Sequence, residues 1–362
     1  MVRLGDYVSI KTGKLDANAA SEDGQYPFFT CAITPLRIDT YSYDCECVLV
    51  AGNGDLNVKY YLGKFDAYQR TYIIESKNKN NLSLRYLYYF LERYVETLRK
   101  ESIGGVIKYI KLGNLTEAAI PLPPLEEQRR IATTLDQVSD LIAKRRVQLD
   151  KLDLLVKARF VELFGDPLHN TKGWPRLELI KVCKAIFGGG TPSKNHPEYF
   201  MGTVPWVSPK DMKQAIISDS IDHITEEAIA NSTTNLVPVN SVLMVIRSGI
   251  LKHTLPVAIN SVPVTINQDM KAFVPDNDIL TEFLMHYFKA IESDVLSGVR
   301  GVTADNIDFK AFQKRMIIVP PFEIQQEFSA FIQRSEKSKS TIQQSLNKLE
   351  TLKKALMQQY FG

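Results

Sequence analysis

The chain has 362 residues, of which 44% are hydrophobic and 23% are charged. This composition is usual for globular proteins and excludes the fibrous and disordered classes, and the length predicts two or three domains at about 150 residues each. The formal net charge is only +3. Charge alone therefore does not mark a nucleic-acid binder, although a folded domain can gather positive charge on one face.

The sequence indicates a soluble, cytoplasmic protein. Four cysteines in a chain of this length favour a reducing compartment over a disulfide framework, and Cys45 and Cys47 have no neighbouring His or second Cys pair to complete a zinc site. The segment from Met1 to Asp6 lacks the apolar core of a signal peptide. No apolar run approaches the roughly 18 residues of a membrane span.

Residues 1–121 have the pattern of a mixed α+β domain. Strand-like runs occur at Cys47–Val50, Lys59–Leu62 and Thr71–Glu75, and turn residues such as Gly52-Asn53-Gly54 separate them. The segment Leu84–Leu98 is predicted to be an amphipathic helix. We expect this region to be the first globular domain.

Residues 122–165 are predicted to form one long helix. Pro123 and Pro124 suit a helix start, no Pro or Gly occurs between Leu125 and Phe164, and Gly165 stands where a C-terminal cap belongs. Forty residues would make a rod of roughly 60 Å. Apolar residues recur every seven positions along it, which is typical of a coiled-coil seam.

The second half of the chain repeats this plan. Residues 166–319 contain strand-like runs at Val242–Arg247, Pro256–Asn260 and Lys271–Val274, followed by a predicted helix at Leu280–Ile291. Residues 320–362 then form a second tail that aligns without a gap onto 123–165, with twelve of 43 positions identical. The same offset of 197 pairs Leu87 with Leu284 and Gly104 with Gly301.

The duplicated helices are expected to pair with each other as an antiparallel coiled coil. The alternative is that each helix only packs on its own domain. The residues that we assign to helix pairing are Leu135, Ile142, Leu149, Leu152 and Val156 in the first copy, and Ile342, Leu346, Leu349 and Leu356 in the second.

At this point the chain resembles the specificity subunits of type I restriction–modification systems. The run Ile120-Pro121-Leu122-Pro123-Pro124-Leu125-Glu126-Glu127-Gln128 matches the family's proline-rich entry into a conserved helix, and Val319–Gln325 is a weaker second copy. The runs Gly188–Lys194, Pro205-Trp206-Val207 and Ile266-Asn267-Gln268-Asp269 are similar to segments of target recognition domains.

The resemblance implies an α+β protein with two target recognition domains, 1–121 and 166–319, separated by conserved helices at 122–165 and 320–362. In this family each domain reads one half of a bipartite, asymmetric site in double-stranded DNA, and the helices dock two methyltransferase subunits. Those partners bind S-adenosylmethionine, and motor-nuclease subunits that use ATP and magnesium join the complex. The chain itself is expected to hold no cofactor and no metal, to have no catalytic residues and to bind no membrane.

Candidate DNA-contacting residues are polar or basic side chains that could reach a base edge or a phosphate. An exposed Lys or Asn on a loop is as often simply solvated. The candidates in the first half are Lys11, Lys14, Thr30, Asn53, Asn57, Lys59 and Arg70. Those in the second half are Thr191, Ser193, Lys194, Asn195, Lys210, Arg247, Lys252 and His253.

Two other functions remain open on sequence. The first is an adaptor or scaffold that binds proteins through two globular domains. The second is a nuclease built on Asp66, Glu75 and Lys77, whose loose spacing also arises by chance. The glycine run 188–190 is not a phosphate-binding loop, because no Gly-Lys-Ser/Thr follows it. We interpret the run as a backbone approach to DNA, with an ordinary turn as the alternative.

Overall fold

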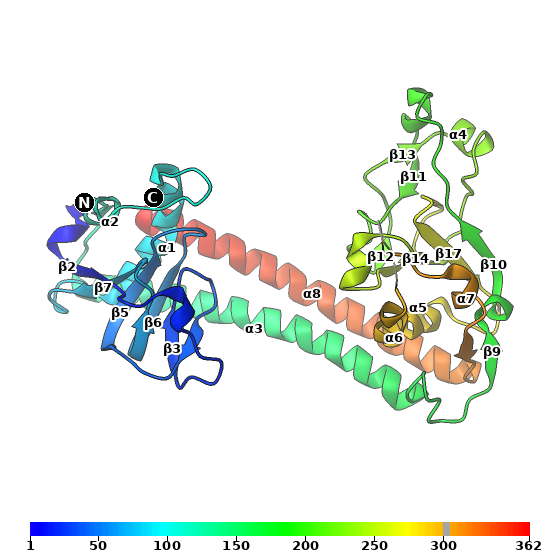
Figure 1. The fold of residues 1–362 in the computed structure, drawn as a ribbon, viewed down its shortest axis with the longest axis horizontal. Helices are drawn as coiled ribbons and strands as arrows, with labels where there is room; N and C mark the ends of the chain where they lie inside the picture. The colour runs from blue at the N-terminus through cyan, green and yellow to red at the C-terminus, as the bar shows by residue number, and fades with distance from the viewer. Residues whose placement is uncertain (300–304) are drawn as a thin grey trace. The chain divides into compact units, whose positions relative to one another are not determined.

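The computed structural model describes residues 1–299 and 305–362, and Gly301 therefore lies outside the described residues. The chain forms two compact units. The first contains Met1–Gln148 together with Ile342–Gly362, and the second contains Leu149–Thr341. Both units are mixed α+β structures (Figure 1). Among the described helices, none is long and apolar enough to cross a membrane.

The first unit is built on a six-stranded sheet in the order β2-β7-β5-β6-β3-β4. All neighbouring strands are antiparallel except β3 and β6, which are parallel. The strands are β2 (Val8–Thr12), β3 (Tyr26–Phe29), β4 (Leu36–Ile38), β5 (Tyr43–Ala51), β6 (Val58–Ala67) and β7 (Thr71–Ser76). The helix α1 (Leu84–Glu101) buries one face against β5 and β6.

The second unit has a five-stranded sheet with the order and orientations of the first sheet, except that β4 has no counterpart among the described strands. Its strands run β10-β17-β14-β15-β12, with only the β12–β15 pair parallel. They are β10 (Cys183–Gly188), β12 (Ile216–Ile217), β14 (Val242–Val245), β15 (Val257–Asn260) and β17 (Met270–Pro275). The helix α5 (Thr281–Ala290) covers it as α1 covers the first sheet. The duplication therefore extends to the globular parts, where the sequences align poorly.

Short elements complete each unit. Each unit also has a two-stranded antiparallel sheet, which we call the clasp. It pairs β1 (Val2–Arg3) with β8 (Ala119–Ile120) in the first unit and β9 (Arg176–Glu178) with β18 (Met316–Ile318) in the second. The second unit adds a three-stranded sheet, β13-β11-β16, with its own small core around Tyr199 and Ile224. The remaining elements are α2 (Leu112–Thr116), β11 (Val204–Val207), β13 (His223–Ile224), α4 (Glu226–Ala230), β16 (Thr265–Ile266), α6 (Glu292–Ser297) and α7 (Phe309–Phe312).

The predicted strands and helices of both halves are confirmed, with small differences at their ends. The predicted strand Lys59–Leu62 is too short, because β6 continues to Ala67, and the predicted strand Val242–Arg247 is too long, because β14 ends at Val245. Beyond it the N–H groups of Ile246 and Arg247 both donate to the carbonyl of Asp269, at 2.8 and 3.2 Å. One acceptor shared by two successive donors breaks the alternation of a regular ladder.

The two long helices are confirmed as an antiparallel pair. Helix α3 (Leu125–Phe164) ends at Gly165, whose φ of 75° is the left-handed cap geometry that glycine favours. Within the first unit, Arg146 of α3 pairs with Glu350 of α8 (Phe322–Phe361) at 2.7 Å. Within the second unit, Asp153 pairs with Lys339 at 2.6 Å. In the same unit Arg159 of α3 pairs with Glu327 of α8. Partner numbers within this unit therefore fall on α8 as they rise along α3, which only an antiparallel pair allows.

The residues assigned to helix pairing are buried to different degrees. On α3, Leu135, Ile142 and Val156 are buried, and Leu346 is buried on α8; Leu149, Leu152, Ile342, Leu349 and Leu356 are half-buried. Leu135 belongs to the core of the first unit and Val156 to that of the second. Because the long helices supply core residues to both units, the assignment of 122–165 and 320–362 as separate spacer segments stays a prediction.

One buried glutamine anchors the start of each long helix. The Gln128 amide nitrogen donates to the carbonyls of Asn81 and Pro123, at 2.9 and 2.8 Å, and its amide oxygen accepts from the N–H of Ser83 at 3.0 Å. Gln325 makes the corresponding three bonds, with donation to Asp278 and Pro320 and acceptance from Leu280. Every partner is displaced by the same 197 residues.

The ends of the two long helices are buried through equivalent aromatic contacts, again displaced by 197 residues. The Phe164 ring lies 4.8 Å from the Phe283 ring in the second unit, and the Phe361 ring lies 5.1 Å from the Tyr86 ring in the first. Each tail therefore begins at a buried amide and ends in an aromatic core.

The glutamine bonds predict a large and local stability effect. Gln128→Ala would leave one N–H and two carbonyls without their buried partner, at about 1–3 kcal/mol for each unsatisfied group. We expect Gln128→Ala to lower the free energy of unfolding of the first unit by about 3 kcal/mol, measured by urea denaturation. Gln137→Ala, at an exposed site of the same helix, is the control and should change stability by less than about 0.5 kcal/mol. Equal effects would contradict the anchoring role.

Candidate nucleic-acid interface

Backbone hydrogen bonds join four loops of the first unit. The Gln69 N–H donates to the carbonyl of Leu15, the Tyr68 N–H to that of Phe29, and the Gly52 N–H to that of Arg70, all at 2.8–3.0 Å. These bonds join the segments 13–15, 29–32, 52–57 and 68–70. Six of the seven first-half candidates lie on these loops or at their edge: Lys14, Thr30, Asn53, Asn57, Lys59 and Arg70.

Glycine allows this close approach in both units. A Cβ at Gly13 would lie 2.1 Å from the carbonyl oxygen of Ala67, and one at Gly189 would lie 1.7 Å from that of Asn267. The Gly190 N–H also donates to the carbonyl of Ile266 at 3.0 Å. The glycine run is thus explained by packing against the protein's own backbone. Its additional approach to DNA stays a prediction.

Three first-half candidates hold one loop in place. The buried Thr30 hydroxyl accepts from the N–H of Ala32 at 3.2 Å, and the Asn57 amide donates to the carbonyl of Cys31 at 2.8 Å. The Lys59 ammonium donates to the carbonyl of Ala32 at 2.8 Å and to the Asn57 amide oxygen. Burial lowers the pKa of Lys59. These contacts give Thr30, Asn57 and Lys59 a structural task inside the domain.

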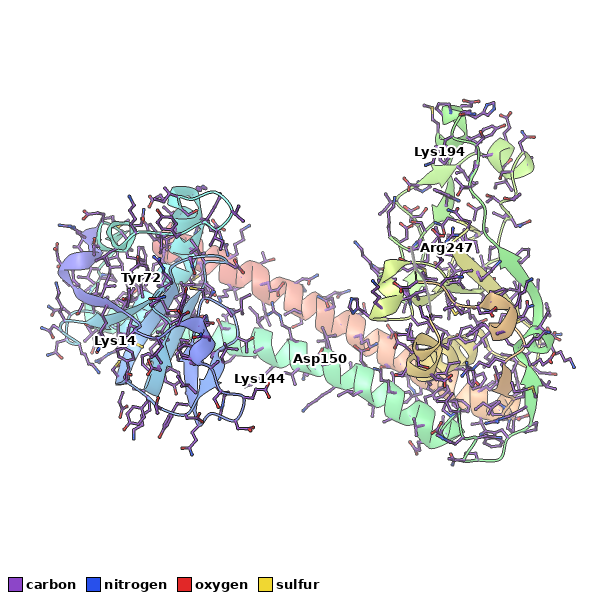
Figure 2. The ribbon with its side chains drawn as sticks, viewed as in Figure 1. Lys14, Tyr72, Lys144, Asp150, Lys194 and Arg247 are labelled. Atoms are coloured by element: carbon purple, nitrogen blue, oxygen red, sulfur yellow. The ribbon has the colours of Figure 1, made fainter. Side chains whose placement is uncertain are left out.

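The other basic candidates of the first unit differ in their partners. Lys11 lies on β2 and pairs with Glu75 of β7 at 2.5 Å, and this hydrogen bond raises its pKa. Lys14, labelled in Figure 2, and Arg70 are both exposed. In the part of the chain that the structure describes, neither pairs with an acidic group within 4.0 Å. They are the cations most available to a phosphate.

In the second unit, the motif 266–269 brings two candidates together. The Arg247 Nε donates to the Asp269 carboxylate at 2.6 Å, and the Thr191 hydroxyl bonds the Gln268 amide oxygen. The Arg247 side chain is exposed, and among the described residues its two terminal nitrogens have no hydrogen-bond partner. They can therefore make a bidentate contact, the usual way in which arginine reads guanine. Gln268 and Asp269 were noted only as part of a motif, and the candidate list missed their positioning role.

Asn53 and Arg247 occupy equivalent positions in the two units. Asn53 forms an isolated β-bridge with Tyr109, and Arg247 forms one with Asn306. Tyr109 and Asn306 are again separated by 197 residues. The same site after the central strand therefore carries a base-reading residue type in each unit.

The remaining second-half candidates form a looser set. Lys252 lies 3.9 Å from Asp305, and Lys210 lies 3.3 Å from Asp222. His253, Ser193, Lys194 and Asn195 are exposed. Figure 2 shows Lys194 in the region of the three-stranded sheet, apart from Arg247. The second unit thus presents two groups of candidates, one around Arg247 and one on the additional sheet.

The residues of the nuclease alternative are engaged elsewhere. The buried Asp66 accepts from the Ser42 hydroxyl at 2.6 Å, Glu75 pairs with Lys11, and Lys77 donates to the carbonyl of Gly5 at 2.9 Å. Asp66 and Glu75 also lie on β6 and β7, which β5 separates. Within residues 1–299 and 305–362, no three His, Cys, Asp or Glu side chains are grouped to hold a metal ion.

Comparison with known proteins decides the family. The model of the type I restriction modification DNA specificity domain matches residues 1–151 and 171–351, so both halves match. The chain belongs to this family. An adaptor that binds only proteins is not favoured.

Its relatives include specificity subunits from bacteria and archaea. The chain is 33% identical to the EcoR124I/EcoR124II specificity subunit of Escherichia coli, over 76% of this chain and 68% of the relative. It is 40% identical to the EcoDI specificity subunit of the same organism, over 43% of this chain and 34% of the relative. A MjaIX specificity subunit of Methanocaldococcus jannaschii is 27% identical over 70% of this chain and 63% of the relative.

Solved structures of the family share the fold. The S subunit from M. genitalium superposes with a TM-score of 0.65 at 16% identity, covering 100% of this chain and 95% of that one. A structure described as concerning complex assembly and conformational transition of the type I R-M system gives 0.58 at 17% identity, with coverage of 99% and 96%.

The contacts predict that two lysines of one loop cluster behave differently. Lys14→Ala should weaken binding to all DNA sequences alike and lower the slope of log K against log salt by about 0.9, because it removes one phosphate contact without disturbing the fold. Lys59→Met should instead lower thermal stability, because the loop at Ala32 loses its anchor. Salt-titrated anisotropy and melting curves separate the two. A change of stability without a change of salt slope in Lys14→Ala would contradict the assignment.

Proposed function

We propose that this chain is the DNA-reading subunit of a type I restriction–modification complex. Each unit reads one half of a bipartite, asymmetric site in double-stranded DNA, and the paired helices α3 and α8 carry the two methyltransferase subunits. Motor-nuclease subunits join through that complex. The chain supplies recognition and assembly, and the partners supply catalysis.

The internal duplication is the observation that carries the proposal. Both units have five strands in the same order and orientation, the same clasp and the same buried glutamine. Asn53 and Arg247 then take equivalent positions with different side chains. A shared scaffold with different reading residues suits a target whose two halves differ, since base identity is read by side-chain chemistry at the groove edge.

The chemistry of the complex belongs to the partners in this proposal. S-adenosylmethionine is expected on the methyltransferase subunits, and ATP with magnesium on the motor-nuclease subunits. Asp66, Glu75 and Lys77 are bonded to other groups of the fold. In this proposal the chain's own residues therefore bind and orient DNA and do not cleave it. Turnover of DNA by the isolated chain that disappears in Glu75→Ala would contradict this division.

Exchange of one domain tests whether recognition is modular. Replacing 166–319 by the corresponding region of another family member should change one half of the methylated motif and leave the other half unchanged. Each half is expected to depend only on its own unit, because the candidate readers contact residues of that unit. Methylome sequencing of a host that carries the chimaera gives the motif. A change in both halves would show that the two domains share recognition.

Lengthening the helices tests whether they set the distance between half-sites. Four residues inserted near 145–149, matched by four near 342–346, add about 6 Å to each helix. We expect the unspecified spacer to grow by one or two base pairs, at about 3.4 Å each, with the half-site bases unchanged. The insertion also rotates the seam by about 40°, so some affinity should be lost. An active variant with the original spacer would mean that the helices do not set this distance.

A further inference from the structure

The segment between α1 and α2 (Figure 1) is a hairpin loop closed by one antiparallel β-bridge between Ile103 and Tyr109. Ile103 and Tyr109 exchange both backbone hydrogen bonds, at 3.0 and 2.9 Å. Val106 is fully exposed at the tip, and the side chain of Ile107 is 63% exposed. Two adjacent aliphatic side chains therefore face solvent where the hairpin projects.

The fold of the hairpin does not depend on these two side chains. Gly104 has a φ of 111°, which permits the tight turn, and a Cβ at Gly105 would meet no atom within 4 Å. Neither Val106 nor Ile107 belongs to the hydrophobic core of the unit or packs against it. Exposed aliphatic residues gathered without a structural task are typical of a contact surface.

The hairpin is fixed to the candidate reading loops by backbone bonds. The Gly54 N–H donates to the carbonyl of Lys108, and the Ile110 N–H donates to the carbonyl of Gly52, both at 2.9 Å. Asn53, between these glycines, forms its β-bridge with Tyr109. Any DNA that Asn53 reads therefore also lies beside the hairpin.

We propose that this hairpin enters the major groove of the half-site read by the first unit, where Val106 and Ile107 contact thymine methyl groups. The proposal rests on the proposed function. The major groove is wide enough to admit a two-stranded ribbon, and the thymine methyl group is its apolar feature. Two aliphatic side chains complement that group, as the amide of Asn53 complements the edge of adenine.

Lys108 supports this orientation of the hairpin. It is exposed beside the apolar tip, and in the described parts of the chain no acidic group lies within 4.0 Å of its ammonium. A lysine next to an inserted tip suits a phosphate at the edge of the groove, where it would add affinity without sequence preference.

Deoxyuridine provides a direct probe, because it pairs like thymidine but lacks the methyl group. The full chain, assembled with its methyltransferase subunits, is titrated against duplexes in which each thymine of the first half-site is replaced in turn. For the unmodified chain we expect at least one replacement to weaken binding about fourfold, the value for one buried methyl-sized group. The double variant Val106→Ser/Ile107→Ser should bind the thymine duplex more weakly and show no further loss with deoxyuridine.

A matched control uses another exposed aliphatic residue of the same unit. Leu62 lies in β6 opposite Glu46 and is 67% exposed, and Leu62→Ser should leave both affinity and the deoxyuridine effect unchanged. Equal sensitivity to deoxyuridine in the double variant and the unmodified chain would overturn the proposal. Failure of the variant to assemble with methyltransferase subunits would also overturn it and identify the tip as a protein contact. If the unmodified complex does not distinguish its target from random DNA, the proposed function itself fails.

Discussion

The buried amide at the start of each long helix is the constraint on which the rest of the structure depends. Gln128 is fully buried, and its two donors and one acceptor bond three backbone groups from two segments. Its side chain thereby connects the loop that leads into α1, at Asn81 and Ser83, with the proline turn before α3. A carboxylate or an aliphatic side chain of similar size cannot make this set, because only an amide both donates and accepts there. These bonds fix the start of each long helix to its own unit.

Reading residues also need a fixed orientation before DNA arrives. Asp269 holds Nε of Arg247, and this carboxylate in turn accepts from the side-chain amide of Asn267 at 3.3 Å, while the Asp269 N–H donates to the amide oxygen of Asn267 at 3.1 Å. A guanidinium that is already oriented loses less rotational freedom when it binds a base, which increases the net affinity of the contact. The carboxylate also disfavours a phosphate at the same position by like-charge repulsion. Such a pair therefore favours a base contact over general adhesion to the DNA backbone.

The sequence was sufficient for the parts of the fold that depend on local pattern. The forty-residue helices followed from the absence of Pro and Gly and from the glycine cap, and the strands around Val48 and Leu243 followed from apolar runs between turns. The order of strands did not follow, because strand pairing joins residues that are far apart in sequence. The candidate site was limited in the same way. The sequence alone does not distinguish Lys14 from Lys59. The contacts of the Lys59 ammonium with the Ala32 carbonyl and the Asn57 amide oxygen show that Lys59 anchors a loop, whereas Lys14 is a solvated cation.

The division of the long helices between two units has a consequence for how the chain folds during synthesis. The second unit, Leu149–Thr341, is continuous in sequence, whereas the first needs residues beyond Ile342 to complete its core. Phe361, which packs against Tyr86, belongs to this late segment. The domain that is translated first is thus completed last, and it must keep its unfilled core from aggregating while the other domain folds. A stalled or shortened translation product would hold one finished reading domain and one open core.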